Sequence, residues 1–233
     1  MPLRAIVFDF DGVIANTEPL HLRAAQRVLA ARGVSLDEVD YYDRYLGFDD
    51  AGMYRALAAR RGLPAEARDV HRYVEEKTQV LQSLIDDGSV LFAGVRECIA
   101  RCAARTPLAI ASGALGHEIE MILRRTGLRD AFQVIVGAGD TPRSKPAPDP
   151  YTLAVERLRA MPVTDLAADQ CIAIEDSQWG LESARAAGLR CVAVAHTYPA
   201  ASFRDVEFVA ATLAEITVER LEAICAQASR GHP

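Results

Sequence analysis

The sequence predicts an α/β fold in which a doubly wound parallel sheet is interrupted, after its first strand, by a helical insert. From Gly94 onward, short apolar runs alternate with stretches of helical periodicity. This alternation is typical of βαβ units in a parallel sheet covered by helices on both faces. A further apolar run of the same kind, RAIVFDF, lies at the other end of the chain.

The composition is that of a globular protein large enough to bury a core. The 233 residues are 50% hydrophobic and 25% charged, which suffices for one large domain or for a main domain with an insertion. The net charge of −6 and the pI near 5.4 provide no basic field for nucleic acid or anionic lipid. No apolar run is long enough to cross a bilayer or to form a signal peptide. We therefore expect a cytoplasmic protein with no nucleic-acid and no membrane partner.

The elements follow in order along the chain. RAIVFDF, residues 4–10, is the first strand, and residues 17–92 show no strand pattern. Three segments of this insert carry helical spacing and end at glycines: 20–33 at Gly33, 51–62 at Gly62 and 69–88 at Gly88. After the insert, three strand and helix pairs and one last strand are predicted. They are PLAIAS with 115–128, FQVIVGAG with 151–161, QCIAIED with 177–189, and RCVAVAH.

The cysteines indicate neither a disulfide framework nor a metal site. They are five in number and scattered through apolar or helical contexts: Cys98, Cys102, Cys171, Cys191 and Cys225. Cys98 and Cys102 share a predicted helix, but no second pair of cysteines or histidines completes a tetrahedral set. Buried free thiols are the expected state.

Polar residues stand where several predicted strands end. Asp9, Ser112 and Asp176 close three apolar runs, and Asp140 follows another. Parallel strands bring their carboxyl ends to one edge of the sheet, where ligands of doubly wound folds bind. We therefore expect these side chains to converge there.

The converging set is suited to phosphoryl transfer. Carboxylates a few ångströms apart repel by about 4 kcal/mol at an effective dielectric of 20, so Asp9, Asp11, Glu175 and Asp176 need a compensating cation. A site made almost entirely of carboxylates favours Mg²⁺. Lys145 supplies a further positive charge, and Ser112, with the backbone amides after it at a predicted helix start, supplies donors for phosphate oxygens.

The two aspartates at the end of the first predicted strand each have a predicted role. Asp9 is the candidate nucleophile, which would form an aspartyl-phosphate. Asp11, two residues later, would protonate the leaving oxygen and then activate water. Gly12 allows the sharp turn that must follow.

Four stretches carry a resemblance to a known family. DFDGV, ASG, SKPAPDPY and IEDSQWG, in this order, resemble the motifs of the haloacid dehalogenase-like hydrolase superfamily, in its β-phosphoglucomutase-like branch. The resemblance implies a Rossmann-like core of residues 1–16 and 93–233 and a helical cap domain of residues 17–92. It also implies Mg²⁺ held by Asp9, the backbone carbonyl of Asp11 and Asp176, and a water shell oriented by Glu175. Ser112 and Lys145 would bind the transferring phosphoryl group, and Gly113 is a candidate for contact with the substrate.

The insert carries the residues that bear on the substrate. Thr17 and His21 match positions that serve the mutases of this branch as linker and acid/base-orienting residues, and Lys77 matches their cap lysine. Where those mutases carry an arginine for a second phosphate, this chain has GFDDAG, with Asp49 and Asp50.

The resemblance therefore implies a Mg²⁺-dependent phosphatase of a small phosphorylated metabolite, a sugar phosphate. Two alternatives stay open: a β-phosphoglucomutase-type isomerase, and a catalytically inactive binding protein of the same fold. The sequence leaves the oligomeric state open, a monomer included. Trp179, the one tryptophan, is expected to pack behind the site rather than to contact substrate.

Overall fold

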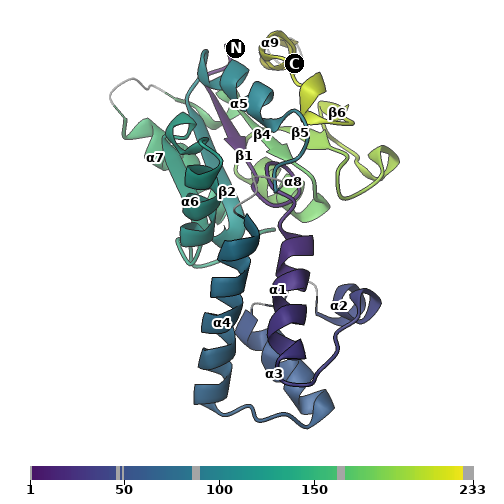
Figure 1. Cartoon of the computed structure of the whole chain (residues 1–233). Helices are drawn as coiled ribbons and strands as arrows, with labels where there is room; N and C mark the ends of the chain where they lie inside the picture. Colours follow the sequence, from purple (N-terminus) through teal and green to yellow (C-terminus); the bar gives the residue numbers. More distant parts are fainter. Residues whose placement is uncertain (1, 46–47, 49, 86–89, 162–165, 228–233) are drawn as a thin grey trace. The chain divides into compact units, whose positions relative to one another are not determined.

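The computed structural model describes residues 2–45, 48, 50–85, 90–161 and 166–227. The chain divides into two compact units (Figure 1). One comprises Met1–Asn16 together with Leu91–Pro233, and the other is the intervening Thr17–Val90.

The first unit is built on a six-stranded sheet of order β3-β2-β1-β4-β5-β6, in which every neighbouring pair is parallel. This arrangement confirms the predicted doubly wound α/β fold, with β1 between β2 and β4 (Figure 1). The strands are β1 (Ala5–Phe8), β2 (Leu108–Leu115), β3 (Val134–Ala138), β4 (Cys171–Glu175), β5 (Arg190–Val194) and β6 (Phe208–Ala210). The short β6 has no counterpart among the predicted strands.

The strand register aligns the end of β1 with one residue in each of the two neighbouring strands. Phe8, the last residue of β1, pairs with Ile110 of β2 and with Ile174 of β4. The residues directly after these pairs therefore emerge at the same edge of the sheet.

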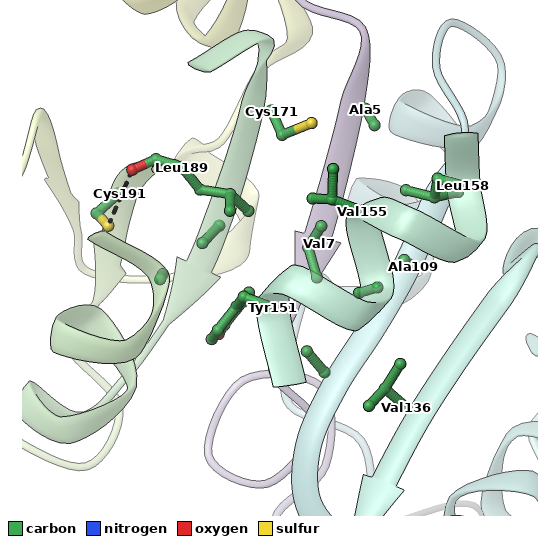
Figure 2. Packing of buried hydrophobic residues seen from close by; sticks show 14 of the residues in the cluster. Ala5, Val7, Ala109, Val136, Tyr151, Val155, Leu158, Cys171, Leu189 and Cys191 are labelled. Carbon is green, nitrogen blue, oxygen red and sulfur yellow. Dashed lines mark hydrogen bonds between the residues drawn. The ribbon is translucent and has the colours of Figure 1, made fainter. Parts of the chain in front are cut away.

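Alternate residues of the strands bury both faces of the sheet. On one face Val7, Ala109 and Val136 pack under α7 (Asp149–Arg159), which contributes Tyr151 and Val155 (Figure 2). The helix α8 (Gln178–Ala186) adds apolar side chains to the same cluster.

The opposite face of the sheet is also buried. Ile6 and Phe8 of β1 are fully buried, and the Phe8 ring meets Phe132 edge to face at 6.0 Å between centroids. Side chains that alternate between two buried faces explain why these strands read as continuous apolar runs. The other helices of this unit are α5 (Val95–Ala103), α6 (Gly116–Arg125) and α9 (Val218–Gln227).

Two sequence expectations concern the whole chain. All five cysteines lie in the described part of the chain, where they are buried and form no disulfide. Among the described residues, no helix combines the length and the apolar character that a membrane crossing requires.

The second unit consists of helices alone within its described residues. They are α1 (Glu18–Ala30), α2 (Glu38–Arg44), α3 (Asp50–Arg61) and α4 (Ala67–Ile85). The helices α1 and α4 lie side by side (Figure 1). The aromatic rings of Tyr54 and Tyr73 stack at 4.5 Å inside the unit. Gly33 and Gly62 adopt positive φ just after α1 and α3, as their predicted places at helix ends require, whereas Gly88 lies outside the described residues.

Candidate active site

Three buried carboxylates meet at the carboxyl edge of the sheet. Asp9 follows β1 directly, Glu175 is the last residue of the adjacent β4, and Asp176 comes next. One oxygen from each lies within 4.8 Å of the others, which is close enough to share a metal ion. The convergence follows from the register, because β1 and β4 end level with each other.

Lys145 lies against two of these carboxylates. It belongs to the loop between β3 and α7, and its Nζ donates to Asp9 Oδ1 at 2.8 Å and to Glu175 Oε1 at 2.5 Å. The ammonium also lies 5.0 Å from the centre of the Tyr151 ring. Contacts with Asp9, Glu175 and Tyr151 therefore hold the side chain of this loop lysine in place.

The electrostatics of the cluster favour the binding of a cation. Burial, together with the charge of Glu175, raises the pKa of Asp9 well above its ordinary value and that of Asp176 to about 6. Burial opposes the charged form of Lys145, but Asp9 and Glu175 outweigh it and raise the pKa of the lysine. Among the described residues, one ammonium faces three carboxylates, and a divalent cation would offset the remaining repulsion.

Glu175 is held rigidly, and both of its oxygens are already occupied. Oε1 accepts from Lys145 and from the Tyr151 hydroxyl at 3.0 Å. Oε2 accepts from the Asp176 amide at 3.0 Å and from the amide and hydroxyl of Ser177 at 3.2 and 3.0 Å. This saturation suits a residue that positions the cluster rather than a direct metal ligand.

The rigidity of Glu175 leads to a prediction for Gly180. A Cβ at Gly180 would lie 1.7 Å from Glu175 Oε1, and Glu175 cannot withdraw without losing its hydrogen bonds. We expect Gly180→Ala to lower the free energy of unfolding by about 1–3 kcal/mol and to reduce turnover, since the cluster must shift. Thermal unfolding and a phosphate-release assay would measure both.

The matched control is Gly116→Ala in the first turn of α6, where an added Cβ meets no atom within 4 Å. Equal stability and activity in the two variants would show that the contact with Glu175 has no such effect.

The structure adds three residues to the site that the sequence did not single out with a role. The hydroxyl of Tyr151 bonds Glu175, that of Thr197 donates to Asp176, and His196 Nδ1 lies 2.9 Å from the Gly12 carbonyl oxygen. Tyr151 was visible in the SKPAPDPY stretch, whereas Thr197 and His196 lie after β5 and gave no motif signal. They line the site because β5 pairs with β4.

Gly12 makes the turn that the sequence predicts, and the structure shows what crowds it. Its φ is +80°, and a Cβ there would lie 1.9 Å from Asp176 Oδ2. Asp11, just before it, is partly exposed, and its backbone bridges to Ala15. Asp11 is not one of the three clustered carboxylates found among the described residues.

Ser112 differs from its predicted setting at a helix start. It is buried inside β2, and α6 begins only at Gly116, after Leu115. The register with β3 shifts between Ala111 and Leu115, so an irregular stretch of strand continues past the expected boundary. Within it, Ser112 Oγ accepts from the Ala114 amide at 3.1 Å, and Gly113 is exposed.

The acidic cluster fits the magnesium ion that the resemblance implies. Asp9 and Asp176 present carboxylate oxygens close together in a buried setting, and such oxygens are the ligands that Mg²⁺ prefers. The raised pKa of both groups fits a site that needs a cation. Asp9 and Asp176 would hold the ion, and Glu175 would orient its surroundings.

Two of the predicted cap residues, His21 and Lys77, form a polar cluster with Asp50 inside the second unit. Lys77 of α4 is only 2% exposed, donates to Asp50 of α3, and has its Nζ 2.9 Å from His21 Nδ1 on α1. Asp49 lies outside the described residues. Thr17 is buried at the start of α1, where its carbonyl accepts from the amides of Leu20 and His21.

His21 makes the stability of this unit depend on pH. Burial, together with the charge of Lys77, lowers the pKa of His21 to about 4, although Asp50 opposes the shift. Between about pH 6.5 and pH 4 the unfolded chain binds a proton that folded His21 does not, so stability present above this range is lost as pH falls through it. We expect a loss of up to about 3 kcal/mol in chemical denaturation.

His21→Gln should remove this pH dependence. His71→Gln is the control, because His71 is exposed and pairs with nearby Glu75 on α4. An unchanged pH slope in His21→Gln would contradict the assignment.

Known proteins resemble the chain over most of its length. The sequence model of the haloacid dehalogenase-like hydrolases matches residues 6–194. Fructose-1-phosphate phosphatase YqaB of Escherichia coli is 31% identical over 81% of this chain and 95% of its own. Hexitol phosphatase B of the same organism is 31% identical over 93% of this chain and 96% of its own.

A solved structure agrees with these matches. The crystal structure of CbbY from Rhodobacter sphaeroides in complex with phosphate is 28% identical, with a TM-score of 0.75 over 92% of this chain and 96% of that one. The family match includes Asp9, Ser112 and Glu175. The chain belongs to the haloacid dehalogenase-like hydrolase family.

Proposed function

We propose that the chain is a Mg²⁺-dependent phosphatase that hydrolyses a small sugar phosphate through an aspartyl-phosphate on Asp9. The observation that carries the proposal is the meeting of Asp9, Lys145 and Asp176 at the carboxyl edge of the sheet. Relatives that are named phosphatases of fructose 1-phosphate and of hexitol phosphates support the substrate class.

In the first step, Asp9 attacks the phosphorus atom, and the bond between phosphorus and the sugar oxygen breaks. Lys145, at 2.8 Å from Asp9 Oδ1, fixes the nucleophile and offsets charge on the phosphoryl oxygens. Ser112 and Gly113 would donate hydrogen bonds to these oxygens. Bound Mg²⁺ would neutralise negative charge where phosphate and carboxylates meet.

Asp11 would handle the protons of both steps. It gives a proton to the departing sugar oxygen, then takes one from the water that attacks the aspartyl-phosphate, and free phosphate leaves. Its partly exposed position beyond the cluster suits a group that exchanges protons.

Asp11→Asn should therefore slow hydrolysis of a sugar phosphate by about 10²–10⁴-fold. The rate of the first step should fall less with p-nitrophenyl phosphate, because p-nitrophenolate leaves without a proton. Single-turnover kinetics with both esters measures this difference. Wild-type rates with the sugar phosphate would contradict the role of Asp11.

A panel of phosphate esters, assayed for released phosphate with Mg²⁺ and with EDTA, tests the function. We expect release from sugar phosphates that EDTA abolishes. Conversion of β-glucose 1-phosphate in the presence of a bisphosphate primer, with little free phosphate, would instead establish the mutase alternative. No activity on the whole panel would favour the inactive binding protein. The ion pair of Lys77 with Asp50 supports the phosphatase, since it engages a cation that could otherwise hold a second phosphate.

A further inference from the structure

The chain makes a tight turn shortly after β1, and this turn carries Asp11. We call residues 10–15 the Gly12 turn. Within it, the Gly12 amide donates to the Ala15 carbonyl at 2.9 Å, and two further amides donate to the Phe10 carbonyl at 2.8 and 3.0 Å. These bonds join the turn to itself. They fix its shape, but its place against the rest of the first unit depends on other contacts.

His196 links the Gly12 turn to the segment that follows β5. Its Nδ1 lies 2.9 Å from the Gly12 carbonyl oxygen. Because a carbonyl oxygen only accepts, Nδ1 must carry the hydrogen and donate it. Glycine has more backbone freedom than any other residue, so a fixed partner for its carbonyl restricts rotation at the centre of the turn.

The same imidazole ring makes a second contact, with Phe92. The two rings stack with their centroids 4.1 Å apart and their planes 20° apart. The Phe92 amide in turn donates to the carbonyl of Ile14 at 3.2 Å. His196, Phe92 and the Gly12 turn therefore form a closed ring of contacts, and all of these residues belong to the first unit.

We propose that His196 is a positioning residue, which holds Asp11 in place for proton transfer by fixing the carbonyl of the Gly12 turn. The inference rests on the proposed function, because it adds a supporting group to the proton transfers assigned there to Asp11. A general acid or base must lie within hydrogen-bond reach of the atom that it serves, so a small shift of the turn lowers the rate. In this role His196 keeps its own Nδ1 hydrogen throughout the reaction.

Two substitutions separate the contacts of His196. His196→Phe keeps a ring that can stack on Phe92 but removes the donor, whereas His196→Asn removes the ring and keeps an amide donor near the place of Nδ1. With saturating Mg²⁺, we expect His196→Phe to slow the first step with a sugar phosphate by about 10–100-fold in single-turnover kinetics. We expect His196→Asn to stay within about threefold of the wild type.

The leaving group distinguishes positioning of Asp11 from general damage to the site. With p-nitrophenyl phosphate, whose leaving group needs no proton, the first step in His196→Phe should slow by less than about threefold. A wild-type rate in His196→Phe with the sugar phosphate would overturn the proposal. So would equal losses in the two variants, or equal losses with the two esters.

A double-mutant cycle tests whether His196 acts through Asp11. In Asp11→Asn the proton-transferring group is already gone, so the addition of His196→Phe should slow hydrolysis by less than about a further threefold. A purely structural role would give the same loss with and without Asp11. That result would refute the proposal.

NMR reads the hydrogen bond without any need for activity. Nitrogen-15 spectra of the imidazole side chains near neutral pH should show the His196 hydrogen on Nδ1, and the signal is assigned by its loss in His196→Asn. A hydrogen on Nε2 alone would overturn the proposal and leave the phosphatase standing. Failure of the wild type on every phosphate ester would instead remove the proposed function, and the positioning role with it.

Discussion

Asp9→Asn is expected to abolish phosphate release, by on the order of 10⁴-fold or more in kcat, because the amide cannot attack phosphorus. The folded state should remain. Asparagine keeps the shape of aspartate and removes one of three crowded negative charges, so without Mg²⁺ the melting temperature should stay the same or rise. A phosphate-release assay and thermal unfolding of the same preparation measure the two effects.

Asp140→Asn is the matched control for this variant. Asp140 also follows a strand end, that of β3, but it pairs with the exposed Arg157 and lies outside the acidic cluster. Its amide variant should keep activity near that of the wild type. Activity in Asp9→Asn within tenfold of the wild type would remove Asp9 from the nucleophile's role.

Lys145→Ala is expected to have the next largest effect. Its loss leaves Asp9 and Glu175 without the ammonium that contacts both, in surroundings that exclude most water. We expect kcat to fall by about 10²–10³-fold, and the free energy of unfolding at neutral pH to fall by on the order of 3 kcal/mol. Stopped assays and chemical denaturation measure the two losses.

Arg143→Ala tests whether the loop alone explains the effect of Lys145→Ala. Arg143 lies in the same loop, is largely exposed and pairs with Asp149. This variant should resemble the wild type in both measurements. If it loses as much activity as Lys145→Ala, disturbance of the loop rather than the lost ammonium is responsible.

The sequence could predict those site residues that lie at the ends of strands. Asp9 and Asp176 follow apolar runs, and parallel pairing brings such positions to one edge regardless of their separation along the chain. The fold class followed from the same alternation. Lys145 was identified from its motif, because a loop has no periodicity that predicts the direction of a side chain.

Residues outside the strand pattern escaped prediction for physical reasons. Ser112 was expected at a helix start, yet the strand continues past it through an irregular register that depends on β3. Trp179 was expected to pack behind the site, but Leu181 and Ala184 face the core from α8 and Trp179 is exposed. Thr197 reaches Asp176 only because β5 lies next to β4, a fact of topology that local sequence does not carry.

The aspartyl-phosphate on Asp9 is the central claim, and chemical trapping tests it most directly. Asp11→Asn, in which attack of water is slow, would be mixed with Mg²⁺ and the preferred sugar phosphate and quenched with borohydride, which reduces an acyl phosphate to an alcohol. Peptide mass spectrometry should then find homoserine at position 9. Homoserine at another acidic residue, or an unaltered Asp9 in a sample that has released its sugar, would contradict the account.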